Sequence, residues 1–395
     1  MATSFPPVYI VSAARTPIGA FLGSLASVAA PRLGATAIQG ALSRAKVSAD
    51  LVNEVFMGNV LSAGIGQAPA RQAAIYAGIP NTVPATTVGK VCGSGTQAII
   101  LAAKSIALGD ADIVVAGGME SMSNVPYYLQ KARDGYRMGD GKLVDGMIFD
   151  GLWDPYSNVH MGNCGDACAK EYQFSREAQD EFAKESFRRA VAAQKEGLFD
   201  AEIEAVSVPQ RKGDPLLVKL DEGPTKGDPS KFPGLKPAFS KDGTITAANA
   251  SSINDGASAL VLASEAAVKK HGLEPLGRIK GYAAAAQAPE WFTTAPAKAI
   301  DAVSAKLGVK SDSFDLYEIN EAFAVVTMVV SKLCNLDAGK VNVRGGAVSL
   351  GHPIGASGAR IVTTLLHAMK DRKAKTGVAS ICIGGGEALA LVVER

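Results

Sequence analysis

A cysteine in a glycine-rich segment is the first residue of this sequence that could do covalent chemistry. Cys92 lies in segment 89–96, GKVCGSGT, between a β-prone run at 83–88 and a helical run at 96–108, so we expect it at a strand-to-helix turn. The positive end of a helix favours a thiolate, and Gly93 and Gly95 would let a substrate approach the sulfur closely. The alternative is a buried structural thiol, because free cysteine is among the most buried residue types.

Three segments of the second half also carry polar or reactive side chains that packing alone explains poorly. Asn320 and Glu321 stand where a buried strand is expected to become a helix, and His352 stands among glycines before another helix. Cys382 ends an apolar strand directly before the triple glycine 384–386. Taken separately, each has a structural alternative, with Asn320 as a helix cap, His352 as a turn histidine and Cys382 as a core thiol.

The composition indicates a well-packed globular protein. The chain has 395 residues, which favours two lobes or domains, with 47% apolar and 20% charged residues. A net charge of +2 gives no signal for nucleic-acid binding, and no apolar run approaches the roughly 20 residues needed to cross a bilayer. We therefore expect neither nucleic acid nor a membrane as a partner.

The chain carries no recognisable address, which favours a cytoplasmic location. Residues 1–7 lack the basic and apolar regions of a signal peptide, and the last five residues are not a peroxisomal signal. Five cysteines without an export signal favour free thiols over disulfides.

Strand-like and helix-like stretches alternate along the chain, which predicts an α/β layered core with parallel strand pairing. Strands are expected at 8–14, 52–60, 112–118, 276–282 and 314–319, with two more in 377–393; helices are expected at 31–45, 69–76, 96–108, 296–307, 322–334 and 355–370. The helix and strand after Cys92 resemble the helix and strand after Gly355, which predicts a duplicated lobe. The proline- and lysine-containing stretch 206–250 interrupts this order, either as a loop for a phosphorylated ligand or as a solvated linker.

Taken together, the motifs resemble those of the thiolase family. They are VSAARTPIG (11–19), VCGSG (91–95), NASSINDGA (249–257), NEAFA (320–324), GHPIG (351–355) and CIGGG (382–386). The resemblance covers nearly the whole chain and implies a duplicated five-layered αβαβα thiolase fold. It also implies an N-terminal lobe at 1–122 and 252–274, an inserted loop domain for acyl-CoA and oligomer contacts at 123–251, and a C-terminal lobe at 275–395.

The resemblance also implies roles for the reactive residues. Cys92 would be the nucleophile that carries an acetyl group as a thioester, and His352 would be the base that takes its proton. Cys382 would take the methyl proton of a second acetyl-CoA for a Claisen condensation. The enolate oxygen would be held by His352 and a water on Asn320, and the tetrahedral intermediate by the N–H groups of Cys92 and Gly384.

Substrate contacts are likewise implied by resemblance. His160 and Met161 would limit the acyl chain length, and Lys226 would meet the nucleotide end of coenzyme A. The pantetheine tunnel would be lined by Leu152, Ala247, Ser251, Ala322 and Phe323.

No metal or cofactor is expected, because coenzyme A thioesters are substrates. Some thiolases bind potassium through a tyrosine, which segment 221–226 lacks, although Ala247, Ala248, Ala250 and Val348 match. His160, Cys164 and Cys168 recur at helical spacing, but the ends of such a row lie about 12 Å apart, too far for one zinc ion. Cys334 is expected in the core, and His271 and His367 at the surface or at helix ends.

The resemblance therefore implies an acetyl-CoA C-acetyltransferase activity, with acetyl-CoA, acetoacetyl-CoA and CoA as ligands. A broad-range degradative 3-ketoacyl-CoA thiolase is the second reading, and a non-catalytic lipid carrier is disfavoured because all four reactive side chains are present. Segment 126–142 resembles the loop through which family members form tetramers, so a homotetramer is expected.

Overall fold

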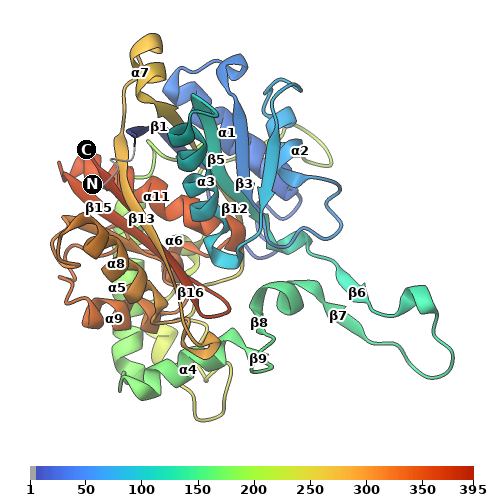
Figure 1. The fold of residues 1–395 in the computed structure, drawn as a ribbon. Helices are drawn as coiled ribbons and strands as arrows, with labels where there is room; N and C mark the ends of the chain where they lie inside the picture. Colours follow the sequence, from blue (N-terminus) through green and yellow to red (C-terminus); the bar gives the residue numbers. More distant parts are fainter. Residues whose placement is uncertain (1–5) are drawn as a thin grey trace.

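One mixed β-sheet runs through the molecule and divides into two halves (Figure 1). The computed structural model describes residues 6–395. Residues 1–5, which belong to the N-terminal segment that favoured a cytoplasmic location, lie outside the described residues. The N-terminal half contains β1 (Val8–Arg15), β3 (Glu54–Gly58), β4 (Ala85–Val88), β5 (Ile113–Ser121) and β12 (Asn254–Ser264), with β2 (Gly19–Ala20) beside β12; the C-terminal half contains β13 (Gly277–Ala286), β14 (Leu316–Ile319), β15 (Thr376–Ile383) and β16 (Glu387–Glu394). The halves join where β1 pairs with β13, at Tyr9–Arg278 and Ile10–Gly277.

The strand pairing corrects one prediction. Strand β3 runs parallel to β4 and β5, and β14 runs parallel to β15, as expected. However, β12 is antiparallel to β1, β2 and β5, and β16 is antiparallel to β13 and β15, so a purely parallel core is wrong. The reason is clearest for β16, which follows β15 through a tight glycine turn, and strands joined by a tight turn must be antiparallel.

Three helical layers alternate with the two halves of the sheet, which confirms the five-layered αβαβα fold. The outer face of the N-terminal half is covered by α1 (Ala30–Ala45), α2 (Pro69–Tyr76) and α7 (Glu265–His271), and that of the C-terminal half by α8 (Ala295–Leu307) and α9 (Ala324–Leu333). Between the halves lie α3 (Ser94–Leu108) and α11 (Ile354–Asp371). The stretch Val91–Leu108 is apolar and long enough for a membrane span, but its position in the middle layer explains that composition.

The two central helices approach each other closely because small residues meet between them. A Cβ on Gly95 would lie 2.6 Å from the backbone nitrogen of Ala359, and a Cβ on Gly358 would lie 2.5 Å from that of Thr96. The Thr96 hydroxyl donates to the Gly358 carbonyl at 3.0 Å. Larger residues would separate the helices, so the glycines allow the first turns of α3 and α11 to lie side by side.

The topology confirms the predicted duplication. The order β1–α1–β3–α2–β4–α3–β5–β12 in the N-terminal half is repeated in the C-terminal half as β13–α8–β14–α9–α11–β15–β16, in which, over the described residues, no named strand corresponds to β4. In particular, α3 and β5 correspond to α11 and β15, as the sequence indicated. The halves also differ in the connection of their last two strands, because β15 and β16 are joined by glycines 384–386, whereas residues 122–253 stand between β5 and β12.

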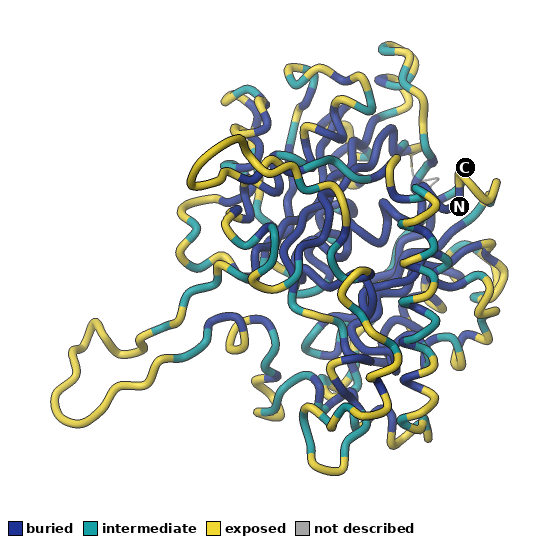
Figure 2. Tube along the Cα trace, turned by 180° about the vertical axis from the view of Figure 1, so that it is seen from behind, coloured by how far each residue is buried: buried dark blue, intermediate teal, exposed yellow. Residues whose placement is uncertain are grey.

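The segment 122–253 forms a loop-rich excursion from the core. Its elements are the 3-10 turn η3 (Met122–Asn124), β6 (Tyr127–Leu129), the 3-10 turn η4 (Ala132–Asp134), β7 (Leu143–Asp145), the π-helical turn η5 (Ile148–Leu152), β8 (Trp153–Asp154), β9 (Val159–His160), α4 (Met161–Glu171), α5 (Arg176–Lys195), β10 (Val206–Val208), β11 (Leu216–Val218), α6 (Gly223–Lys226) and the 3-10 turn η6 (Pro229–Gly234). The hairpin of β6 and β7 projects away from the body of the molecule and is largely exposed, as Figures 1 and 2 show. The remainder of the excursion packs against the core.

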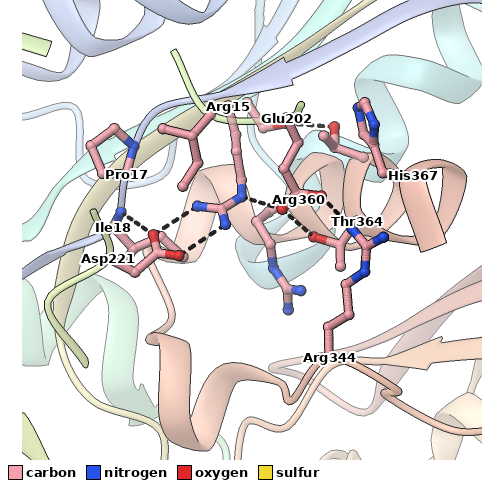
Figure 3. A network of polar contacts seen from close by, with 12 residues as sticks. Arg15, Pro17, Ile18, Glu202, Asp221, Arg344, Arg360, Thr364 and His367 are labelled. Carbon is pink, nitrogen blue, oxygen red and sulfur yellow. Dashed lines mark hydrogen bonds and ion pairs between the residues drawn. The ribbon is translucent and has the colours of Figure 1, made fainter. Parts of the chain in front are cut away.

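A buried arginine ties this excursion to the core (Figure 3). Arg15, at the end of β1, is fully buried and donates to Asp221 at 2.7 and 2.9 Å and to Glu202 at 2.6 Å. Asp221 also accepts the backbone N–H of Ile18 at 2.8 Å. Because both carboxylates belong to the excursion, the guanidinium joins two of its segments to the first strand.

The second carboxylate of this network connects to the middle layer. Glu202 accepts from the Thr364 hydroxyl at 3.1 Å, and Arg344 lies 3.7 Å from its other oxygen. Burial alone would raise the pKa of Glu202, but Arg15, His367 and Arg344 hold it below the usual value. The prediction that His367 lies at the surface or at a helix end is wrong: it is buried, with Nε2 3.1 Å from the Ala13 carbonyl, because α11 is covered on both sides.

Replacing Asp221 with asparagine should destabilise the protein by about 3–5 kcal/mol, because it leaves a buried guanidinium short of one charge partner. The urea midpoint, followed by tryptophan fluorescence, measures this. Glu204→Gln is the matched control, since Glu204 pairs with Arg44 at side-chain exposures of 39% and 28%, and such a pair contributes about 1 kcal/mol or less. Equal midpoints for the two variants would contradict the prediction.

Candidate active site

The turn that carries Cys92 is a strained elbow between β4 and α3, which confirms the predicted strand-to-helix turn. Cys92 is the middle residue of the 3-10 turn η2 (Val91–Gly93). Val91 has a φ of 43°, which is a true outlier for a β-branched residue. Ser94 holds the elbow, because its Oγ accepts the Lys90 N–H at 2.8 Å and donates to the Val91 carbonyl at 2.7 Å. Strain of this kind, about 1–3 kcal/mol, clusters at functional sites.

The elbow opens on a cavity of about 240 Å³ that contains most of the predicted site residues. Its wall includes Cys92 from the N-terminal lobe and His352 and Gly384 from the C-terminal lobe. The predicted substrate-binding residues that also line it are Leu152, His160, Met161, Ser251, Ala322 and Phe323. Residues from both lobes and from the excursion therefore enclose one space.

His352 is oriented by hydrogen bonds on both ring nitrogens. Nδ1 lies 2.5 Å from the Ser357 hydroxyl, which itself donates to the Pro353 carbonyl at 2.9 Å. That hydroxyl therefore accepts from Nδ1–H, so Nε2 carries the lone pair. Nε2 lies 3.4 Å from Nδ2 of Asn320. The ring thus presents a proton acceptor beside the Asn320 amide.

His352 is neutral at physiological pH. Burial and, second, the positive charge of Arg360 lower the pKa of His352 to about 4. Arg360 is buried behind the histidine and pairs with Glu318 at 3.3 Å. A neutral imidazole with a free lone pair can take a proton, whereas an imidazolium could not.

Asn320 is fully buried at the end of β14, next to His352. The amide oxygen Oδ1 has no hydrogen-bond partner among residues 6–395. A buried amide oxygen without a partner is costly, so it is suited to a water or ligand donor. Asn320 itself does not line the cavity, and its contact with the site is through the His352 ring.

The two cysteines lie close together and both are protonated at rest. Burial raises the pKa of Cys92 to about 11, although the N–H groups of Gly384 and of Cys92 itself donate to the sulfur. The expectation that the helix N-terminus favours a Cys92 thiolate is therefore wrong, because desolvation outweighs those donors. Burial and then the charge of Cys92 raise the pKa of Cys382 well above its usual value. Cys382 lies in β15, behind the cavity wall.

Two predicted contacts lie away from the cavity. Lys226 is at the end of α6, where its ammonium group pairs with Glu222 at 3.0 Å and its side chain is 54% exposed. Ala247 is exposed and is not among the lining residues. Their assignment as substrate contacts stays a prediction.

Sequence reasoning missed several residues that shape the site. Phe239 lines the cavity, stacks on His160 with ring centroids 4.5 Å apart and meets Phe323 edge to face. Its stretch shows no periodicity, so no local signal distinguishes this aromatic residue. Ser357 was visible as a small polar residue just after the histidine motif.

Glu120 is a further residue that the sequence did not single out. It is buried at the end of β5 and accepts the backbone N–H of Gly355 at 2.8 Å and the Asn59 side chain at 2.7 Å. The N–H groups of Val60 and Leu61 also donate to it, at 3.1 and 3.2 Å. The carboxylate thereby fixes the first turn of α11 against the N-terminal lobe.

The three residues at helical spacing that were considered as zinc ligands make other contacts. His160 caps α4 by accepting the Gly162 N–H at 3.2 Å on Nδ1, while Cys164 and Cys168 are buried in the core beside the C-terminal lobe. Within residues 6–395, no group of three His, Cys, Asp or Glu side chains is arranged to hold a metal ion.

The chain matches known proteins over nearly its full length. The descriptions "Thiolase, N-terminal domain" and "Thiolase, C-terminal domain" match residues 8–266 and 273–395. An acetyl-CoA acetyltransferase of Cupriavidus necator is 56% identical over 389 residues, covering 98% of this chain and 99% of the relative. The cytosolic acetyl-CoA acetyltransferase ERG10 of Gibberella zeae is 52% identical over 393 residues, covering 99% of each. The structure of Acat5 thiolase from Ascaris suum in complex with coenzyme A has a TM-score of 0.93 at 46% identity, covering 98% of this chain and 100% of that one.

Alkylation of Cys92 by iodoacetamide should rise about tenfold per pH unit from pH 6 to beyond pH 9, because the thiolate reacts and the pKa of Cys92 is about 11. Mass spectrometry of the Cys92 peptide measures the rate. His352→Gln should leave the profile in place, since a neutral imidazole adds no charge. A plateau between pH 6 and 8 would instead show a preformed thiolate–imidazolium pair.

Proposed function

The chain belongs to the thiolase family, and we propose that it is an acetyl-CoA C-acetyltransferase, which reversibly condenses two acetyl-CoA molecules to acetoacetyl-CoA and free CoA. Relatives named acetyl-CoA acetyltransferase support this activity, and the thiolase solved with coenzyme A supports CoA thioesters as ligands. The observation that carries the proposal is the meeting of Cys92, His352 and Gly384 at one cavity. A thiol suits this exchange, because moving an acyl group between sulfurs is readily reversible.

In the first step, Cys92 attacks the carbonyl carbon of acetyl-CoA. Because Cys92 and His352 are both neutral, proton transfer to Nε2 accompanies the attack rather than preceding it. The tetrahedral oxyanion is held by the N–H groups of Cys92 and Gly384, which converge on the sulfur at rest. The bond from carbon to the CoA sulfur then breaks, and His352 returns the proton to the departing CoA.

In the second step, the Cys382 thiol gives its proton to Nε2 of His352, and the resulting thiolate takes a methyl proton from the second acetyl-CoA. The resulting enolate oxygen is held by the Nε2–H of His352, which now carries the Cys382 proton, and by a water on Asn320, and the enolate carbon attacks the acetyl group on Cys92. Acetoacetyl-CoA leaves as the bond to Cys92 breaks, and Cys382 passes the methyl proton to the Cys92 thiolate. His352 then returns its proton to Cys382, which restores the resting enzyme. Acetylation prevents Cys92 from ionising, so no charge on Cys92 opposes the Cys382 thiolate in the acetyl-enzyme.

The shape of the cavity supports a short acyl group. Phe239 packs on both His160 and Phe323, and these aromatic side chains form one wall with Met161. A broad-range 3-ketoacyl-CoA thiolase would need space for a longer acyl chain where these aromatic side chains pack. No cofactor is proposed, because the thioesters carry the reacting groups themselves.

We also propose a homotetramer and a cytoplasmic location. The hairpin of β6 and β7 exposes 63% of Tyr127, 98% of Met138 and 67% of Leu143, which supports a contact between copies. Sedimentation velocity decides between tetramer and dimer. A relative named cytosolic supports the location, and microscopy of the tagged full chain tests it.

Cys92→Ser should abolish condensation and thiolysis, and wild-type enzyme mixed with acetyl-CoA should carry an acetyl group on the Cys92 peptide. Cys382→Ser should still acquire that group but condense about 10²- to 10⁴-fold more slowly, because the methyl proton has lost its base. Mass spectrometry and a coupled assay for CoA release measure the two steps. Rapid condensation by Cys382→Ser would remove this residue from the mechanism.

Acetoacetyl-CoA should be cleaved with a higher kcat/KM than any longer 3-ketoacyl-CoA, because added methylenes would have to displace the packed side chains of the aromatic wall. A steady-state series of chain lengths measures this ratio. A clear preference for a long chain would establish the broad-range thiolase instead, and the absence of turnover with any chain would favour a non-catalytic carrier.

A further inference from the structure

The oxyanion site on Cys92 is assembled from two lobes at a tightly packed junction. The elbow residue Gly93 touches the C-terminal hairpin so closely that a Cβ there would lie 2.4 Å from Cδ1 of Ile383. In the same place the Gly384 N–H donates to the Cys92 sulfur. One donor comes from each lobe, so their alignment depends on how the elbow sits against the turn at residues 384–386.

An ion pair spans this junction, with one partner two residues before Cys92. Lys90, just before the elbow, pairs with Glu387, the first residue of β16 after the glycine turn. The backbone N–H of Lys90 is also held by Ser94, the residue that restrains the strained Val91. The two charged side chains therefore connect the base of the elbow to the base of the turn that carries Gly384.

This pair is placed to act locally rather than to hold the fold together. The side chains of Lys90 and Glu387 are 25% and 39% exposed, and partly exposed pairs add little to stability. Neither residue lines the cavity, so neither touches the acetyl group. The strained elbow, in contrast, can relax if one of its restraints is removed, and that would move the sulfur relative to Gly384.

We propose that Lys90 and Glu387 are positioning residues that clamp the elbow to the glycine turn and so align the two oxyanion donors. The inference rests on the proposed acetyl transfer to Cys92. It assigns no proton transfer to either side chain. Loss of the clamp slows acetylation of Cys92 while substrate affinity is retained, because the acyl pocket is formed by other residues.

A purely electrostatic role for Lys90 makes a different prediction. A cation near the oxyanion would speed the reaction by its field, and then removing the Glu387 charge would leave the rate unchanged or raise it. In the clamp, the two residues act only as a pair, so removing either charge slows acetylation equally.

The test is rapid-quench measurement of acetyl-Cys92 formation by the full-length enzyme, with mass spectrometric detection. Lys90→Met and Glu387→Gln should each slow the step by roughly 10-fold, below the 100-fold that about 1 Å of misplacement can cost. The double variant should be no slower than either single one, since the pair is lost once. The charge swap Lys90→Glu with Glu387→Lys should recover to within about 3-fold of wild type.

The matched control is Glu204→Gln, which removes a carboxylate of the same 39% exposure far along the chain and should leave the rate unchanged. The apparent affinity for acetyl-CoA and the melting temperature should stay near wild type in all variants. Wild-type rates in both single variants, a faster Glu387→Gln, or multiplicative losses in the double variant would overturn the clamp. A wild-type enzyme that acquires no acetyl group would instead overturn the proposed function.

Discussion

Close contact between α3 and α11 is the constraint on which the rest of the molecule depends. Among the described residues, the two halves of the sheet are joined by only two residue pairs, between β1 and β13. The positions of the two lobes relative to each other are therefore fixed mainly by this central pair of helices. Gly95 and Gly358 let the first turns meet at backbone distance. The loop before one helix carries Cys92 and the loop before the other carries His352, so the contact that joins the lobes also brings nucleophile and base to one cavity.

The excursion completes the site, and a second buried contact holds it in place. Arg15 joins its segments at Glu202 and Asp221 to β1, while Glu202 is bonded to Thr364 of α11. Paired charges of this kind are costly to bury, so they favour one arrangement over others more than they add stability. The segment that supplies His160, Met161 and Phe239 is therefore fixed to β1 and to α11, the helix that His352 precedes.

The sequence predicted the order of elements, the duplication and the elbow, because hydrophobic periodicity and glycines mark these locally. It could not predict that burial outweighs the helix N-terminus at Cys92, since desolvation depends on atoms from both lobes. Phe239 and Glu120 were missed for the same reason, as their roles come from neighbours distant in sequence. His367 was misplaced because a helix covered on both sides resembles an amphipathic one until the second layer is known.

The unequal connections of the two lobes have a consequence for biosynthesis. In the C-terminal lobe only three glycines separate β15 from its partner β16, but in the N-terminal lobe β5 must wait for β12, with Ser121 pairing to Asp255. A nascent chain therefore displays one edge of β5 unpaired while the whole excursion leaves the ribosome. Such an edge is a template for intermolecular aggregation, so the N-terminal lobe, although translated first, is the part of the molecule with the greater need for a chaperone.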